Sequence, residues 1–418
     1  MFQNVVLYKL NNKFVEEEKN MEIKLDVFQT MALATIIFYF GSFIKSKVTL
    51  LKKYCMPSAV IGGVIFAILV LILKITNIAT INLDTSLQDI FMTAFFTSIG
   101  YTASLKVLKK GGAKVGIFLI ISSGLVIMQN VLGTSLAYVF NLNPLLGLAT
   151  GSIPLVGGHG TSGSFGPLLE KIGVSGATTV SFAAATFGLI MGSVLGGFVA
   201  KTLVERNKLK TPKTEGDEDI SLNNIEENDK TILSHDKIMK AAALIFIAMG
   251  AGSIITNIIE DIGLTFPSYI GAMLAGAIIK NICDFKKVEI ADKEIEILGG
   301  ISLNFFLSLA LMNLRLWELF ELALPMIIML IAQTILMFIF AYFIIFKVMG
   351  KDYDAAVFAS AICGFGMGST ANAVANMDAL NSKYGFAQTP YFVVPIVGCL
   401  FIDFINSAVI TVFINILG

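Results

Sequence analysis

Long apolar stretches alternate with short polar connections along most of the chain. They cover residues 27–44, 58–73, 90–104, 115–140 and 177–204 before a polar break, and 238–259, 267–282, 298–314, 322–348 and 391–417 after it. A helix that crosses the hydrocarbon core of a bilayer needs about 20 predominantly apolar residues. The pattern therefore predicts an all-α polytopic membrane protein, with five transmembrane helices on each side of the break.

Two further apolar pieces, rich in glycine, lie between the fourth and fifth stretch of each set. The predicted division is a polar N-terminal extension (1–20), a first repeat (21–204) with a glycine-rich loop at about 144–172, a linker (205–236), and a second repeat (237–418) with its loop at about 354–382. Residues 1–20 lack the apolar core of a signal peptide, and we expect them to be an extension or the result of a mis-assigned start, with Met21 as the natural start. The linker is rich in Lys, Glu, Asp and Asn, which is typical of a solvated segment.

The two sets resemble each other. Four matches recur in order: Pro57-Ser58 with Pro267-Ser268, Phe95-Phe96 with Phe305-Phe306 and Gly188 with Gly398, each 210 positions apart, and Gly158 with Gly366, 208 positions apart. Four matches in the same order across matching stretches indicate an internal duplication.

Basic residues predict the orientation, because cytoplasmic loops carry an excess of Lys and Arg. Clusters follow alternate stretches and fill the linker, with Lys74 and Arg315 as the exceptions. All clusters share one side only if each set crosses the membrane five times and each glycine-rich loop is re-entrant, leaving by the face it entered. Both termini are then outside, the linker is cytoplasmic and the repeats are inverted. Inverted repeats with broken helices near the midplane are typical of alternating-access transporters.

Composition excludes several classes of function. Of the 418 residues, 56% are hydrophobic and only 14% are charged, against roughly 25% charged in a soluble domain. The formal net charge is zero, which argues against a nucleic-acid partner. The four cysteines are scattered without a CxxC pair or a neighbouring histidine, so no transition-metal site is expected.

The first glycine-rich loop reads GSIPLVGGHGTSGSFGPLLE over residues 151–170. We expect its proline and glycines to break the helix: Pro154, Gly157, Gly158, Gly160 and Gly163. The next half-helix then begins with free N–H groups and a positive dipole end, which suit a carboxylate. The predicted substrate contacts are Gly158, His159, Gly160, Thr161 and Ser162, with Ser164 as a possible lining residue. The alternatives are close helix packing through small residues and, for His159, a neutral imidazole hydrogen-bonded at a helix end.

The second glycine-rich loop reads CGFGMGSTANAVANMDAL over residues 363–380. Here we expect Gly364, Gly366 and Gly368 to break the helix, and Ser369 and Thr370 to contact substrate. Asn372 and Asn376 are four positions apart and share one helix face, so their amide oxygens and freed carbonyls suit Na⁺. The alternative is hydrogen bonding between helices.

Asp403 lies near the middle of the last stretch, with Asn406 on the same face. A carboxylate at the centre of a membrane helix costs about 2.5–3.5 kcal/mol on insertion scales and usually faces a cavity. It could bind Na⁺ together with Asn406, or hold an ammonium group of the substrate. Alternatively, it is protonated or paired with a lysine. Three other polar residues, Gln129, Asn130 and Gln333, either line the site or hold helices together.

Both glycine-rich motifs, GSIPLVGGHGT and CGFGMGSTANAVANM, resemble the paired signature loops of the bacterial sodium/glutamate symporter family. Further similar segments are AFFTSIG at 94–100 and VVPIVGCLFIDFIN at 393–406. The resemblance implies a Na⁺-coupled carrier of L-glutamate in the bacterial inner membrane. It also implies a homodimer of two inverted five-helix repeats that works by an elevator-like motion. Ser162 to Phe165 and Ala371-Asn372 depart from the usual pattern, which leaves the exact substrate open.

Other functions fit parts of the sequence. A related carrier could use Na⁺ or H⁺ to move another small carboxylate or amino acid, and an ion channel is the alternative outside the carriers. Residues 160–163 also match the GxSG pattern of intramembrane serine proteases. That chemistry needs a histidine in another span as the base, and neither His159 nor His235 is suitably placed, so an enzyme is not expected.

Overall fold

The computed structural model describes residues 21–110, 112–212, 234–261, 267 and 269–418. The predicted N-terminal extension, most of the predicted linker and Ser268 of the second Pro-Ser pair lie outside these residues.

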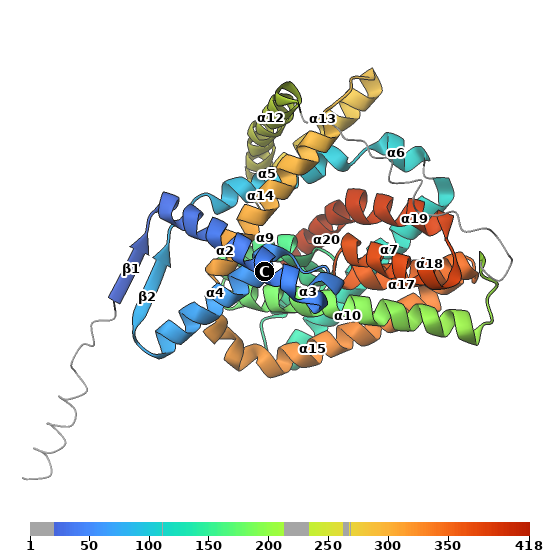
Figure 1. Cartoon of the computed structure of the whole chain (residues 1–418), viewed down its shortest axis with the longest axis horizontal. Helices are drawn as coiled ribbons and strands as arrows, with labels where there is room; N and C mark the ends of the chain where they lie inside the picture. Colours follow the sequence, from blue (N-terminus) through green and yellow to red (C-terminus); the bar gives the residue numbers. More distant parts are fainter. Residues whose placement is uncertain (1–20, 111, 213–233, 262–266, 268) are drawn as a thin grey trace, which may run out of the picture.

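Helices follow the predicted stretches, with ends that differ by a few residues (Figure 1). The first half contains α2 (Val27–Lys47), α3 (Thr49–Lys53), α4 (Ser58–Ile75), α5 (Gln88–Thr102), α6 (Leu105–Lys110), α7 (Gly112–Val139) and α10 (Ala177–Arg206). The second half contains α12 (His235–Asp261), α13 (Tyr269–Lys286), α14 (Asp292–Met312), η3 (Leu316–Glu318), α15 (Leu319–Ile339), η4 (Phe340–Ile345), α16 (Phe346–Val348), α19 (Gln388–Pro395), η5 (Ile396–Phe401) and α20 (Ile402–Leu417).

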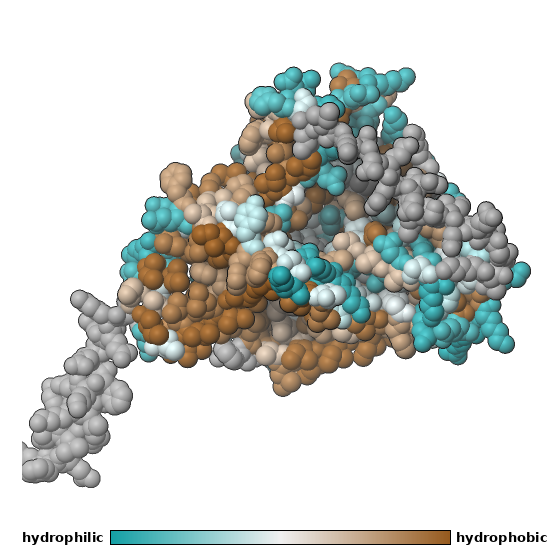
Figure 2. Space-filling view, in the orientation of Figure 1, coloured by the Kyte–Doolittle hydropathy of each residue, from teal (hydrophilic) through white to brown (hydrophobic). Residues whose placement is uncertain are grey.

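Seven of the described helices are long and apolar enough to cross a membrane, and an eighth span results if the bent pair Gln388–Cys399 and Ile402–Leu417 is one. Of the other predicted spans, α5 has only 15 residues and α13 carries charges near its end. Figure 2 shows apolar side chains over α2, α4 and α15, with hydrophilic residues at the tips of α12 and α13. Such a surface is expected where a protein contacts lipid. The structure therefore agrees with a polytopic helical membrane protein.

One short sheet falls outside the prediction. Strands β1 (Met21–Leu25) and β2 (Ala79–Leu83) pair in parallel, with Met21 opposite Ala79. Parallel strands need a crossover connection, and α2 to α4 provide it here. The sheet fixes the start of the described chain to the end of α4.

The described helices pack in two groups. In the first, called here the six-helix group, α2 packs on α4, α4 on α14, α14 on α5, α5 on α13 and α13 on α12. In the second, called the glycine-loop group, α10 packs on both glycine-rich segments, and α7 packs on the first of these segments, α15 and α20. Fewer contacts join the two groups than hold each one together.

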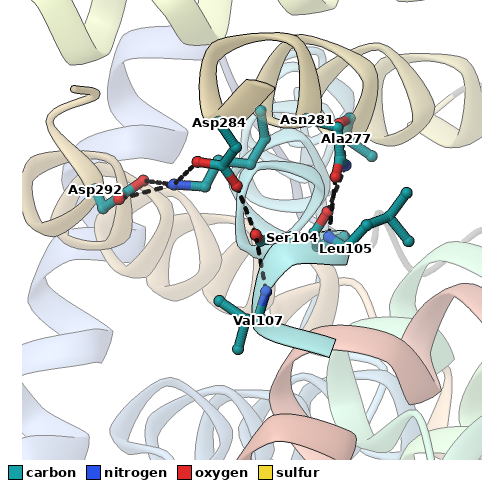
Figure 3. A network of polar contacts seen from close by, with 9 residues as sticks. Ser104, Leu105, Val107, Ala277, Asn281, Asp284 and Asp292 are labelled. Carbon is teal, nitrogen blue, oxygen red and sulfur yellow. Dashed lines mark hydrogen bonds and ion pairs between the residues drawn. The ribbon is translucent and has the colours of Figure 1, made fainter. Parts of the chain in front are cut away.

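A polar network ties the start of α6, which leads from one group to the other, to the six-helix group (Figure 3). Asn281 of α13 accepts a hydrogen bond from Leu105 N at 2.9 Å and donates one to Ala103 O at 2.7 Å. Ser104 Oγ donates to Asp284 Oδ2 at 2.5 Å. Because these bonds join α13 to the α5–α6 junction, that end of α6 is anchored.

Both glycine-rich segments are broken helices. The first consists of η1 (Pro144–Thr150), α8 (Ser152–Leu155) and α9 (Gly158–Lys171), and the second of α17 (Tyr353–Met367) and α18 (Thr370–Tyr384). Only some of the glycines interrupt a helix, contrary to the prediction that all do. The first break lies at Val156 and Gly157, and the second at Gly368 and Ser369.

The other glycines expected to break a helix lie inside one: Gly160 and Gly163 in α9, and Gly364 and Gly366 in α17. They allow close packing instead of breaking the helix. A Cβ on Gly163 would lie 2.6 Å from Phe306 Cζ, and one on Gly364 would lie 2.5 Å from the backbone of α18. Pro154 likewise lies within α8, near its end.

Candidate functional site

The two helix breaks lie against each other. Gly158 has a left-handed backbone (φ +60°), and a Cβ there would lie 3.2 Å from the carbonyl oxygen of Gly368. These two residues are 210 positions apart in the chain. The tertiary fold therefore brings the two glycine-rich segments together at their breaks.

Two helices begin at this contact, α9 at Gly158 and α18 at Thr370. The first N–H groups of a helix have no partner within it, and they carry a partial positive charge. Since residues from both helix starts line one cavity, the cavity suits an anionic group such as a carboxylate.

This cavity, called here the tip cavity, has a volume of about 210 Å³. Six of the predicted site residues line it: Gly158, His159, Gly160, Ser369, Thr370 and Asp403. Asp403 is the one acidic side chain among the described residues that line it. The cavity thus combines two helix N-termini with a carboxylate, which are complementary to the carboxylate and ammonium groups of an amino acid.

Ser369 and Thr370 are held in place at the start of α18. Ser369 Oγ accepts a hydrogen bond from Asn372 N at 3.3 Å, as a helix N-cap. Thr370 Oγ1 donates to Gly398 O at 2.9 Å. The hydroxyl group of Thr370 therefore joins α18 to η5, the segment directly before α20 and Asp403.

His159 is buried and hydrogen-bonded to α10. Its Nε2 lies 3.1 Å from Thr186 Oγ1, and that hydroxyl already donates to Phe182 O at 3.0 Å. The Thr186 hydroxyl is therefore the acceptor, and His159 Nε2 is the donor. This hydrogen bond fixes the orientation of the imidazole ring. It uses Nε2, so Nδ1 takes no part in it.

Three predicted site residues of α9 do not line the tip cavity: Thr161, Ser162 and Ser164. Ser162 Oγ donates to Gly158 O at 2.7 Å, and Ser164 Oγ donates to Thr161 O at 3.0 Å. All three side chains are buried, including that of Thr161. In this structure, the serine hydroxyls bind backbone carbonyls of the same segment.

The predicted Na⁺ ligands other than Asp403 lie outside the cavity lining. Asn372 Nδ2 donates to Leu189 O at 2.7 Å, and Asn376 Nδ2 donates to Gly192 O at 3.2 Å. Asn406 Nδ2 donates to Ser152 O at 3.2 Å. Within the described chain, Asn372 Oδ1 and Asn406 Oδ1 are buried and accept no hydrogen bond. Each of these two oxygens therefore has lone pairs available to a cation.

The amides of the two fourth stretches bind to each other's helix or to the glycine-rich segments. Gln129 Nε2 donates to Gly366 O and Gln333 Nε2 donates to Gln129 O, both at 2.8 Å. Asn130 Oδ1 accepts from Ser152 N at 2.9 Å. None of the three is among the residues that line the tip cavity, so in this structure they join helices.

Several lining residues were not predicted. The apolar ones include Phe95, Leu189, Leu303, Leu307, Phe365 and Ile402, and the turn between α3 and α4 adds Cys55 and Pro57. The sequence marks Phe95 and Pro57 only as part of the duplication. The apolar residues that line the cavity are of the same types as residues that face lipid. The sequence alone therefore does not distinguish the two groups.

Comparison of this chain with a family model and with curated proteins finds similarity to sodium/glutamate symporters. Residues 23–386 match the family model described as sodium/glutamate symporter. The sodium/glutamate symporter of Escherichia coli (strain K12) is 40% identical over 395 residues, which cover 93% of this chain and 98% of the relative. The sodium/glutamate symporter of Haemophilus influenzae is 36% identical over 395 residues, covering 94% and 98%.

Proposed function

The chain belongs to the sodium/glutamate symporter family, and on this premise we propose that it takes up L-glutamate, coupled to Na⁺, across the bacterial cytoplasmic membrane. Membership confirms the family that the two glycine-rich motifs predicted, and a transporter rather than an enzyme. The substrate, the coupling ion and the membrane are carried over to this chain from the names of its relatives and from the resemblance.

One observation carries the choice of substrate class: two helix N-termini and Asp403 share the tip cavity. The carboxylates of glutamate bind the N–H groups at the starts of α9 and α18, beside Ser369 and Thr370. Asp403 binds the α-ammonium group or a Na⁺ ion. Since Thr161 and Ser162 lie outside the cavity lining, their part in binding is to support the backbone of α9.

Na⁺ binds near the tip cavity through buried oxygens. Asn372 Oδ1 and Asn406 Oδ1 support this assignment because each is buried without a hydrogen-bond donor in the described chain. Asn376 and backbone carbonyls freed at the helix breaks complete the proposed ligands. Oxygen donors of this kind suit a hard cation.

Transport follows an alternating-access, elevator-like motion in this proposal. The glycine-loop group carries the two helix starts and Asp403 of the tip cavity, and the six-helix group, which adds apolar wall residues from α5 and α14, stays fixed in the membrane. The sparse packing between the groups and the anchored start of α6 support a relative motion (Figure 3). The two glycine-rich segments are proposed to be re-entrant loops of inverted repeats, with both termini outside, the linker cytoplasmic and the protein a homodimer.

Uptake by proteoliposomes tests the proposal. We expect labelled glutamate to accumulate under an inward Na⁺ gradient and not under an equal K⁺ gradient. A proton gradient that drives uptake without Na⁺ would identify H⁺ as the coupling ion instead. Counterflow of labelled glutamate against an excess of unlabelled glutamate is expected of a carrier, and its absence would favour a channel.

A further inference from the structure

A second pocket, of about 390 Å³, lies away from the tip cavity, at the ends of α4 and α14. Strand β2 forms one wall and the residues that follow α14 form another. Lys74, Arg315 and Trp317 are among the residues that line it, together with the polar side chains of Asn82 and Asn313. We call it the cationic pocket.

The two cations of this pocket are the residues that depart from the pattern of basic clusters. Lys74 lies in the last turn of α4, in the first half of the chain, and Arg315 follows α14 in the second half. Loops on the predicted outer face are poor in Lys and Arg, as expected of a non-cytoplasmic face. Two basic residues from opposite halves that meet in one pocket therefore point to an anionic ligand.

Trp317 positions Lys74 without neutralising it. Lys74 Nζ lies 3.3 Å from the centre of the indole ring, where the negative face of the ring attracts an ammonium group. In the described part of the chain, no carboxylate lies within ion-pair distance of Lys74, whereas Arg315 Nη1 lies 3.5 Å from Glu318 Oε1. Lys74 and Arg315 are the charged residues among the described ones that line the pocket, so its lining has a net positive charge.

The cationic pocket adjoins the boundary between the two helix groups. A neighbouring pocket of about 240 Å³ shares Asn313, Leu314 and Arg315 with it and continues to Pro167 and Thr178, at the α9–α10 connection. The opposite end of α9 is Gly158, in the tip cavity. An anion held at Arg315 is thus beside the group that carries the proposed transport site.

We propose that the cationic pocket is an entry site that binds the carboxylates of the anionic substrate before it reaches the tip cavity; this inference rests on the proposed function. Lys74 and Arg315 raise the local concentration of the anion, as clefts lined by one sign of charge do. Because both side chains are exposed to solvent, salt weakens the effect.

Trp317 allows a direct measurement, because it is the only tryptophan of the chain. Purified full-length protein is titrated with choline glutamate in the absence of Na⁺, against choline chloride at equal ionic strength. We expect a saturable change of tryptophan emission in the native protein and in Asp403→Asn. We expect no such change in Lys74→Gln, since the anion no longer displaces an ammonium group from the indole face.

Lys47→Gln is the matched control. Lys47 is an exposed lysine at the end of α2 whose Nζ also lies over an aromatic ring, 5.8 Å from the centre of Phe43, and it does not line the pocket. This variant should keep the emission change. In uptake assays, Lys74→Gln should raise KM about threefold or more at low ionic strength with Vmax unchanged, and the difference should shrink in high salt.

Each outcome decides between the two proposals. An emission change that persists in Lys74→Gln, or none in the native protein, overturns the entry site while leaving Na⁺-driven uptake untouched. A native protein that shows the emission change but no Na⁺-driven uptake overturns the proposed function instead. Size-exclusion elution equal to that of the native protein shows that each variant is folded.

Discussion

Gly158 and Gly368 meet where two helices are broken, and a Cβ on Gly158 would lie 3.2 Å from the carbonyl oxygen of Gly368. Neither residue has a functional side chain. Their lack of side chains lets two helix starts, from opposite halves of the chain, lie at one cavity. Backbone geometry at this contact is therefore central to the proposed binding of carboxylates.

Substituting Gly158 tests that geometry. Gly158→Ala should lower glutamate uptake at least about tenfold, because a side chain at φ +60° costs about 1 kcal/mol or more and crowds the opposite carbonyl. Initial uptake rates, corrected for the amount of inserted protein, measure the effect. Gly124→Ala on α7 is the control, because a Cβ there meets nothing within 4 Å. Native rates in Gly158→Ala would show that the contact is not needed.

Asp403 is the carboxylate of the tip cavity, and its substitution separates two roles. Asp403→Asn should abolish Na⁺-driven glutamate uptake while the protein still inserts. If Asp403 binds the ammonium group, glutarate, which lacks that group, should compete with glutamate for the variant better than for the native protein. If it binds Na⁺, neither ligand should bind in a Na⁺-dependent way. Asp236→Asn, at an exposed position, is the control. Normal coupled uptake in Asp403→Asn would remove this residue from the site.

Gln333 should contribute to stability rather than to substrate affinity. Gln333→Leu removes the 2.8 Å hydrogen bond to Gln129 O, and a lost buried hydrogen bond costs about 1 kcal/mol. We expect a lower Tm in detergent with KM unchanged. Thr334→Val, at the next position, removes a hydroxyl that bonds only within its own helix and serves as the comparison. A raised KM at an unchanged Tm would instead make Gln333 a residue of the binding site.

Spin labels can test the motion of the two helix groups. Tyr39 of α2 and Phe285 of α13 belong to the six-helix group, Ile120 of α7 belongs to the glycine-loop group, and all three side chains are more than half exposed. Pulsed electron paramagnetic resonance should show that the Tyr39–Ile120 distance changes when Na⁺ and glutamate are added. The Tyr39–Phe285 distance should stay constant. A ligand-dependent change within the six-helix group would contradict a rigid scaffold.

Much of the architecture could be predicted from the chain because lipid imposes a local rule. A segment of the bilayer core must be apolar over its whole length and satisfy its own backbone hydrogen bonds, so each helix is visible in its own residues. Hydropathy does not reveal the parallel pair of β1 and β2, because Met21 depends on a partner 58 positions away, Ala79. Single glycines were also ambiguous: Gly158 lies at a break, whereas Gly163 fits against Phe306.

Hydropathy and motifs are properties of neighbouring residues, so the helical segments, the two glycine-rich breaks and the family could all be read from the chain alone. Which polar groups share a cavity depended on the folded arrangement. It joined Ser369 and Asp403 at the tip cavity and placed Asn372 and Asn376 in helix contacts. It also brought Lys74 and Trp317, far apart in the chain, into direct contact. Contacts between residues far apart in the chain depend on how the helices pack, and that packing is set by the shapes of many side chains together.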